Sequence, residues 1–139
     1  MAVRRFRSTQ LKEILKTPQE YEQYKATKGT NIQDVASNVQ QNRYHIVVVV
    51  DNNQVPIGLI TQTDLMRVIE KGESIDPSRQ VDDIMNKDFV KISEEKTVDD
   101  AISLMNSLDI SKLIVVAQNG TFKGVIGKQD IIKEAQKLL

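Results

Sequence analysis

The sequence predicts a mixed α/β (α+β) fold built from two pseudo-symmetric repeats, each with a small three-stranded sheet and flanking helices, packed sheet to sheet. Three observations predict this fold: one sequence motif occurs twice, short β-branched runs alternate with segments of helical periodicity, and turn residues separate neighbouring runs that have the character of strands. A unit of about 60 residues is only marginally stable alone, because it buries only ~60% of the surface of its unfolded chain, so each copy is expected to pack against the other.

The internal repeat is visible without gaps over most of the chain. Residues 58–65 (GLITQTDL) reappear as residues 124–131 (GVIGKQDI). The same offset aligns two further pairs of segments: 31–36 with 97–102, and 47–50 with 113–116. Agreement of pattern, spacing and residue type over this length indicates a tandem duplication.

The two copies differ near their beginnings. Residues 8–15 match residues 78–85 at an offset larger by four, which places four additional residues around Tyr21 and Tyr24 of the first copy. A polar stretch containing a glycine and a proline separates the copies. The expected organisation is repeat 1 over 8–71, a linker over 72–77 and repeat 2 over 78–138.

The main helix of each copy starts at a capping residue. In the second copy Thr97 supplies a hydroxyl at the N-cap and Asp100 a carboxylate three residues on, which is the spacing of a capping box. Apolar residues then recur at helical spacing in both copies: Val98, Ala101, Ile102 and Met105, and Ile32, Val35, Ala36 and Val39. This spacing predicts an amphipathic helix in each repeat.

Each helix is followed by two expected strands joined by a tight turn. The runs Ile46–Val50 and Leu113–Val116 are short, unbroken and β-branched, which is typical of a strand covered on both faces. The second strands are expected after Asn- and Gly-rich turns, over Val55–Ile60 and Thr121–Ile126. A final helix is expected to begin near each of the repeated aspartates, Asp64 and Asp130.

Composition narrows the function classes. The 19 basic and 19 acidic residues give a formal net charge of zero, whereas a general nucleic-acid binder needs a basic surplus. The lack of cysteine removes thiol nucleophiles and cysteine metal sites, and the single histidine, His45, removes histidine-pair metal sites and most histidine-based triads. No apolar run reaches the ~18 residues of a membrane helix and the first residues lack a signal-peptide core, so we expect a cytoplasmic protein.

The ordered set of motifs, present twice, resembles the cystathionine-β-synthase (CBS) domain. In the second copy the resemblance is carried by Val81–Met85, Thr97–Ala101, Leu113–Val116 and Gly124–Ile131. Two copies in tandem resemble a Bateman module, and the likeness covers roughly residues 8–138. The resemblance implies a regulatory sensor and not an enzyme, which dimerises as a flat disc and binds an adenosine compound (AMP, ADP, ATP or S-adenosylmethionine) between its repeats.

The resemblance places the best ligand site in the first copy. It implies that Thr61 contacts phosphate and that Asp64 holds the ribose hydroxyls, since a carboxylate accepts from a cis-diol and a helix start suits an anion. The structural alternative is that Thr61 caps the helix and Asp64 completes its capping box, and one geometry would serve both purposes. In the second copy Asp130 is kept whereas Gly127 replaces the hydroxyl, so that site is expected to be altered.

The resemblance implies further contacts beside the strands. Each copy keeps half of a basic pair that reaches phosphates in the family, namely His45 in the first and Lys112 in the second. Adenine would lie between apolar strand residues that are also candidates for the core: Val47, Ile60, Ile92 and Ile126. Tyr21 and Tyr24 are candidates for stacking on a base.

Alternatives to a sensor stay open from the sequence. A ligand-free dimerisation module would not be stabilised by adenosine compounds, whereas a sensor would be. Catalysis is disfavoured, because adjacent carboxylates such as Asp82 and Asp83 do not face one another on a helix. Mg²⁺ is expected only as an ion that bridges a bound nucleotide. Because the chain has no effector domain, the response is expected in a partner protein acting in trans, or in a part of a longer chain.

Overall fold

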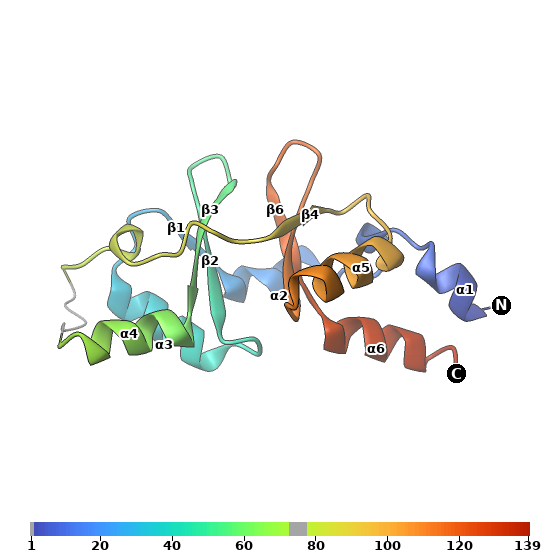
Figure 1. Cartoon of the computed structure of the whole chain (residues 1–139). Helices are drawn as coiled ribbons and strands as arrows, with labels where there is room; N and C mark the ends of the chain where they lie inside the picture. The colour runs from blue at the N-terminus through green and yellow to red at the C-terminus, as the bar shows by residue number, and fades with distance from the viewer. Residues whose placement is uncertain (1, 73–77) are drawn as a thin grey trace. The chain divides into compact units, whose positions relative to one another are not determined.

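The structure, a computed structural model, describes residues 2–72 and 78–139 (Figure 1). The chain forms two compact units. Unit 1 combines Met1–Pro18 with Val90–Leu139, and unit 2 is the intervening stretch Gln19–Phe89. Each unit is described separately below.

Unit 2 has a three-stranded sheet in the order β1-β2-β3. β1 (Lys25–Thr27) pairs in parallel with β2 (Ile46–Val50), and β2 pairs antiparallel with β3 (Pro56–Thr61). The helical elements of this unit are α2 (Pro18–Tyr21, whose first residue belongs to unit 1), η2 (Glu22–Tyr24), α3 (Ile32–Gln41), α4 (Gln62–Glu70) and η3 (Val81–Asp83). Apolar residues of α3, α4 and η3 pack with Val47, Val49 and Ile60 to form the core of the unit.

Unit 1 repeats this plan. β4 (Lys91–Ser93) pairs in parallel with β5 (Lys112–Val116), which pairs antiparallel with β6 (Phe122–Gly127). Its helical elements are α1 (Ala2–Arg7), η1 (Leu11–Glu13), α5 (Val98–Leu108) and α6 (Lys128–Gln136). The expected mixed α/β class, with two three-stranded sheets and flanking helices, is confirmed.

The hairpin strands lie where the sequence indicates, with one consistent shift. All five residues of β2 are buried, as an unbroken apolar run predicts. The second strands start one residue later than expected, because Val55 and Thr121 close the turns: the Val55 carbonyl accepts from the Asp51 N–H at 3.0 Å and the Thr121 carbonyl from the Ala117 N–H at 2.9 Å.

The matched opening segments of the two copies each pack in the unit built mainly from the other copy. Val81 is fully buried in the core of unit 2, and its N–H donates to the Thr30 carbonyl at 2.9 Å. Leu11 is fully buried in the core of unit 1, and its N–H donates to the Lys96 carbonyl at 2.8 Å. The compact units therefore do not coincide with the expected repeats.

The repeat boundaries 8–71 and 78–138 stay a prediction about the duplication. Of the expected linker 72–77, all but Gly72 lies outside the described residues. Gly72 has a φ of 72°, a left-handed backbone that favours glycine just after a helix.

The additional residues of the first copy build an aromatic cluster in unit 2. Tyr21 and Tyr24 are buried, with ring centroids 6.3 Å apart, and the Tyr24 ring lies 5.8 Å from that of Tyr44. Arg43 covers the Tyr44 ring at 5.3 Å. Because these rings already pack against protein, they are poorly placed for stacking on a base.

Candidate ligand site

Thr61 and Asp64 meet at the junction of β3 and α4. Thr61 is the N-cap of α4, and its hydroxyl oxygen accepts from the Asp64 N–H at 3.3 Å. In return Asp64 Oδ2 accepts from the Thr61 N–H at 2.8 Å and from the Thr61 hydroxyl at 3.0 Å. The capping box that the sequence offered as the structural alternative is therefore present.

The second carboxylate oxygen of Asp64 is less engaged. Asp64 Oδ1 lies 3.5 Å from Arg67 Nη1, and the Arg67 side chain is mostly exposed whereas that of Asp64 is 9% exposed. An ionised carboxylate offers about four acceptor positions, and the cap occupies Oδ2. Oδ1 therefore keeps capacity for further hydroxyl donors.

The other candidates in unit 2 lie around this junction in different settings. Ile46 is the cross-strand partner of Thr61, so His45, the residue before Ile46, lies at the same end of the β2–β3 hairpin as Thr61. His45 is exposed with a φ of 56°, and its Nδ1 lies 3.0 Å from the Val39 carbonyl oxygen. Val47 and Ile60 are fully buried in the core of unit 2 and present no surface to a base in this structure.

The equivalent junction in unit 1 lacks the hydroxyl. Gly127 precedes α6, and its N–H donates to Asp130 Oδ2 at 2.8 Å. Lys112 is half-buried and is the cross-strand partner of Gly127, so a basic side chain starts beside the position where the hydroxyl is missing. Ile126 and Ile92 belong to the core of unit 1.

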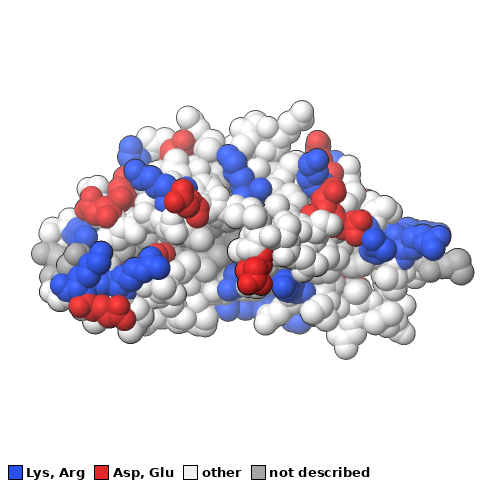
Figure 2. All heavy atoms as spheres, viewed as in Figure 1, with Lys and Arg blue, Asp and Glu red and all other residues white. Residues whose placement is uncertain are grey.

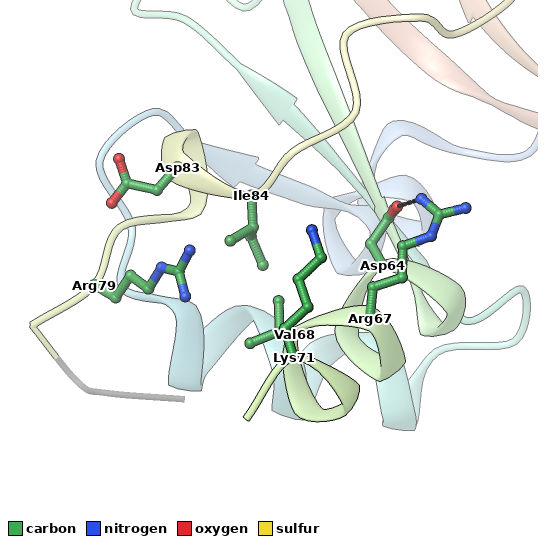
Figure 3. A pocket seen from close by; sticks show the side chains of 7 residues that line it. All are labelled: Asp64, Arg67, Val68, Lys71, Arg79, Asp83 and Ile84. Atoms are coloured by element: carbon green, nitrogen blue, oxygen red, sulfur yellow. Dashed lines mark ion pairs between the residues drawn. The ribbon is translucent and has the colours of Figure 1, made fainter. Parts of the chain in front are cut away.

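A pocket of about 230 Å³ opens beside Asp64 in unit 2 (Figure 3). One side is a face of α4, and the other is formed by η3 and the residues on either side of it. Its lining residues are Asp64, Arg67, Val68, Lys71, Arg79, Asp83 and Ile84. The basic members of this lining were not predicted from the sequence, although positions 64, 67, 68 and 71 have the spacing of one helical face.

The surface charge is mixed. Figure 2 shows basic and acidic side chains interspersed over the visible face. Within the described parts of the chain, no three His, Cys, Asp or Glu side chains gather as a metal-binding group. No helix of residues 2–72 or 78–139 combines the length and the apolar composition that crossing a bilayer requires.

Comparison with known families gives the class of protein that this fold represents. The sequence model of the CBS domain matches residues 23–71 and 81–137. The chain belongs to the CBS domain family and contains two copies of the domain.

The curated relatives are longer than the region that this chain matches. The chain is 31% identical over 101 residues to the uncharacterized protein MK0525 of Methanopyrus kandleri, a match covering 72% of this chain and 51% of that protein. It is 27% identical over 108 residues to an inosine-5'-monophosphate dehydrogenase of Nitrosopumilus maritimus, covering 78% of this chain and 21% of the enzyme. The chain thus spans about half of one relative and about a fifth of the other.

Solved structures share the fold. A CBS domain protein from Pyrobaculum aerophilum, PAE2072, complexed with AMP, has a TM-score of 0.73 at 21% identity, with 93% of this chain and 99% of that chain covered. CBSX2, also in complex with AMP, has a TM-score of 0.77 at 17% identity, with 93% and 97% covered. At this level of identity the likeness concerns the fold.

Proposed function

We propose that this chain is a regulatory module that binds an adenosine nucleotide (AMP, ADP or ATP) and signals to a partner protein in trans. The observation that carries the proposal is the Thr61–Asp64 pair, which stands at the β3–α4 junction with Asp64 Oδ1 still able to accept hydrogen bonds. The AMP complexes of PAE2072 and CBSX2 add support from proteins of the same fold.

The ribose would be held by Asp64. Two adjacent hydroxyls are donors, and an ionised carboxylate is an acceptor with no donor of its own to repel them. The low exposure of Asp64, 8%, strengthens such charge-assisted bonds because little water competes for the carboxylate. Arg67 at 3.5 Å from Oδ1 would move aside or share the oxygen when the diol binds.

The phosphate would be held near Thr61. Its hydroxyl now donates to Asp64 Oδ2 at 3.0 Å, while the Thr61 N–H donates to the same oxygen at 2.8 Å. The hydroxyl proton is thus free to turn toward a phosphate oxygen without leaving Asp64 Oδ2 unpaired. The N-terminal amides of the nine-residue helix α4 add a favourable dipole for an anion.

In unit 1 the proposal assigns a modified site to Gly127 and Asp130. Glycine supplies no hydroxyl, but Lys112 emerges from the strand position directly opposite and would supply a positive charge to the phosphate. His45 has the corresponding task at the edge of unit 2. S-adenosylmethionine, which has no phosphate, would gain little from either basic residue, and Mg²⁺ would enter only together with a polyphosphate.

The second candidate function is a dimerisation module that binds no nucleotide. It is favoured by the completeness of the Thr61–Asp64 capping box and by apolar side chains exposed on helices, Met66 and Ile69 of α4 at 53% and 54% and Ile132 of α6 at 64%. We propose that these side chains form a homodimer contact in either case. Because adenosine nucleotides are intracellular metabolites, the sensor role also assigns the module to the cytoplasm.

The deciding experiment is thermal unfolding with AMP, ADP, ATP and S-adenosylmethionine on wild type, Asp64→Asn and Asp100→Asn. Asp100 is the matched control because it completes the same Thr–Asp box, with its carboxylate 3.0 Å from the Thr97 N–H. A nucleotide at 100 times its dissociation constant should stabilise wild type and Asp100→Asn by about 2.7 kcal/mol, and Asp64→Asn by much less. No stabilisation of wild type at millimolar nucleotide would leave the dimerisation module as the function.

A further inference from the structure

The turn between α3 and β2 of unit 2 is closed by a buried polar side chain. Asn42 is the residue that follows α3, four positions before the start of β2 (Figure 1). It is 2% exposed, and within residues 2–72 and 78–139 the other buried residue with an amide or charged side chain is Asp64. Burial of an amide is costly unless its donor and its acceptor are both satisfied, so the partners of Asn42 show what it holds in place.

Both polar groups of the Asn42 side chain bond to the backbone of one residue, Ile46. Asn42 Nδ2 donates to the Ile46 carbonyl at 2.6 Å, and Asn42 Oδ1 accepts from the Ile46 N–H at 3.2 Å. β1 pairs with β2 only from Val48 onward, so these Ile46 groups lie beyond the end of β1. The Asn42 amide thus fixes the first residue of β2, which is the cross-strand partner of Thr61.

The same turn holds His45 in an unfavourable backbone conformation. Its φ of 56° lies in the left-handed region that residues with a Cβ seldom adopt. The His45 N–H donates to the Asn42 carbonyl at 3.3 Å, and its Nδ1 lies 3.0 Å from the Val39 carbonyl oxygen, in the last turn of α3 where intrahelical donors run out. Because a carbonyl oxygen only accepts, Nδ1 carries the proton of this bond, and a ligand would meet Nε2.

Unit 1 makes the equivalent turn without such a clamp. In the alignment of the two copies Leu108 stands at the place of Asn42, and it is 49% exposed. Ser111 stands at the place of His45, and the left-handed backbone falls instead on Asp109, with a φ of 52°. The fold therefore does not require a buried amide at this turn, and the asparagine occurs in the copy that also has the histidine.

We propose that Asn42 is a positioning residue of the nucleotide site in unit 2: it fixes the turn so that His45 presents Nε2 to a phosphate beside Thr61. A protonated imidazole donates from both nitrogens, so His45 can keep its bond to the Val39 carbonyl while Nε2 donates to a phosphate oxygen. Without the clamp the turn would relax from its left-handed conformation, and binding would have to order the ring again. The inference rests on the proposed function, because a phosphate near Thr61 is part of that proposal.

The single histidine of the chain makes the first test direct. A ¹⁵N imidazole spectrum of the full chain, prepared without a histidine tag, contains the signals of His45 alone. At alkaline pH wild type should show the Nδ1–H tautomer, and Asn42→Ala should move toward the Nε2–H tautomer that solvated histidines ordinarily prefer. Asn31→Ala is the matched control, because it makes the same change at the opposite end of α3, where Asn31 Oδ1 accepts from the Asp34 N–H at 3.0 Å. It should lower the melting temperature and leave the His45 signals unchanged.

The second readout is the affinity for AMP, measured by calorimetry. Asn42→Ala should bind AMP about tenfold more weakly than wild type. In a His45→Asn background, where no imidazole remains to be positioned and asparagine tolerates the left-handed backbone, the same change should cause no further loss. If Asn42→Ala does not fold, Asn42→Leu removes the same bonds without opening a cavity and takes its place.

Three results overturn the proposal: an unchanged imidazole spectrum in folded Asn42→Ala or Asn42→Leu, an affinity loss that adds to that of His45→Asn, or an equal loss in Asn31→Ala. If AMP binding depends on Asp64 and is equal in wild type and Asn42→Ala, the positioning role falls and the proposed function stands. If wild type binds none of AMP, ADP and ATP, the proposed function fails together with the ligand role of His45, and the imidazole spectrum still decides whether Asn42 fixes the ring.

Discussion

Replacing Gly58 by alanine tests how the segment after η3 packs on β3. A Cβ added at Gly58 would lie 2.6 Å from Met85 Cγ, closer than carbon atoms approach in folded proteins, and at a tight 3.0 Å from Met85 Cβ. Neither atom is the far end of the methionine, so the whole side chain must leave its rotamer. Overpacking of this kind costs about 1–3 kcal/mol, and we expect the free energy of unfolding of Gly58→Ala to fall by that amount.

The assay is urea unfolding of wild type, Gly58→Ala, Met85→Ala and the double variant. If Met85 is the obstacle, the double variant should be more stable than the sum of the single effects predicts, by an interaction energy of about 0.5–3 kcal/mol. Gly120→Ala is not a fair control, because Gly120 has a φ of 90° and would be strained for another reason. Strictly additive effects, or a neutral Gly58→Ala, would refute the packing of Met85 on β3.

Two further predictions concern the caps and the helical surface. Hydrogen bonds from the Thr97 backbone and hydroxyl lower the pKa of Asp100 below its usual 3.8. The stabilisation that the ionised Asp100 carboxylate gives the fold is therefore complete above the usual pKa, and it is lost as the pH falls through the lower pKa of the folded state. Asp100→Asn should therefore unfold more easily than wild type at neutral pH in a thermal melt, and the difference should vanish in stronger acid. Ile132, 64% exposed on α6, is expected at the homodimer contact, so Ile132→Glu should convert a dimer to a monomer in light scattering; a dimer that persists would remove α6 from the contact.

Local features of the fold were predictable because they depend on neighbouring residues. The run Ile46–Val50 forms β2 with the expected bounds, and Thr61 caps α4 as its spacing to Asp64 indicates. A β-branched run and a Thr–x–x–Asp box act within a few residues of chain, so the sequence contains all that decides them.

Long-range packing was not predictable in the same way. Leu11 and Val81 occupy matching places in the duplicated pattern, and the pattern is the same whether each residue packs in its own copy or in the other. In the structure each of the two residues packs in the unit built mainly from the other copy. Backbone hydrogen bonds that a periodic pattern does not predict hold it there, such as the one from the Leu11 N–H to the Lys96 carbonyl.

The candidate site was predictable only in part. Thr61 and Asp64 lie together as expected, because one turn of helix separates them. Val47 and Ile60, which the sequence offered both as adenine contacts and as core residues, are fully buried in the core of unit 2, and a contact with a base stays a prediction. Arg79 has no sequence signal at all, because only the fold brings it beside Lys71.

The division of the chain into units has a practical consequence. Along the sequence, the nested stretch Gln19–Phe89 lies between the two pieces of unit 1. The backbone therefore passes from one unit to the other at Pro18–Gln19 and again at Phe89–Val90. A fluorescent protein or surface tether fused to either end of this chain would be attached to unit 1. A probe meant to follow events at Asp64 should therefore be attached inside the nested stretch, for example at the exposed Asn52–Asn53 turn between β2 and β3.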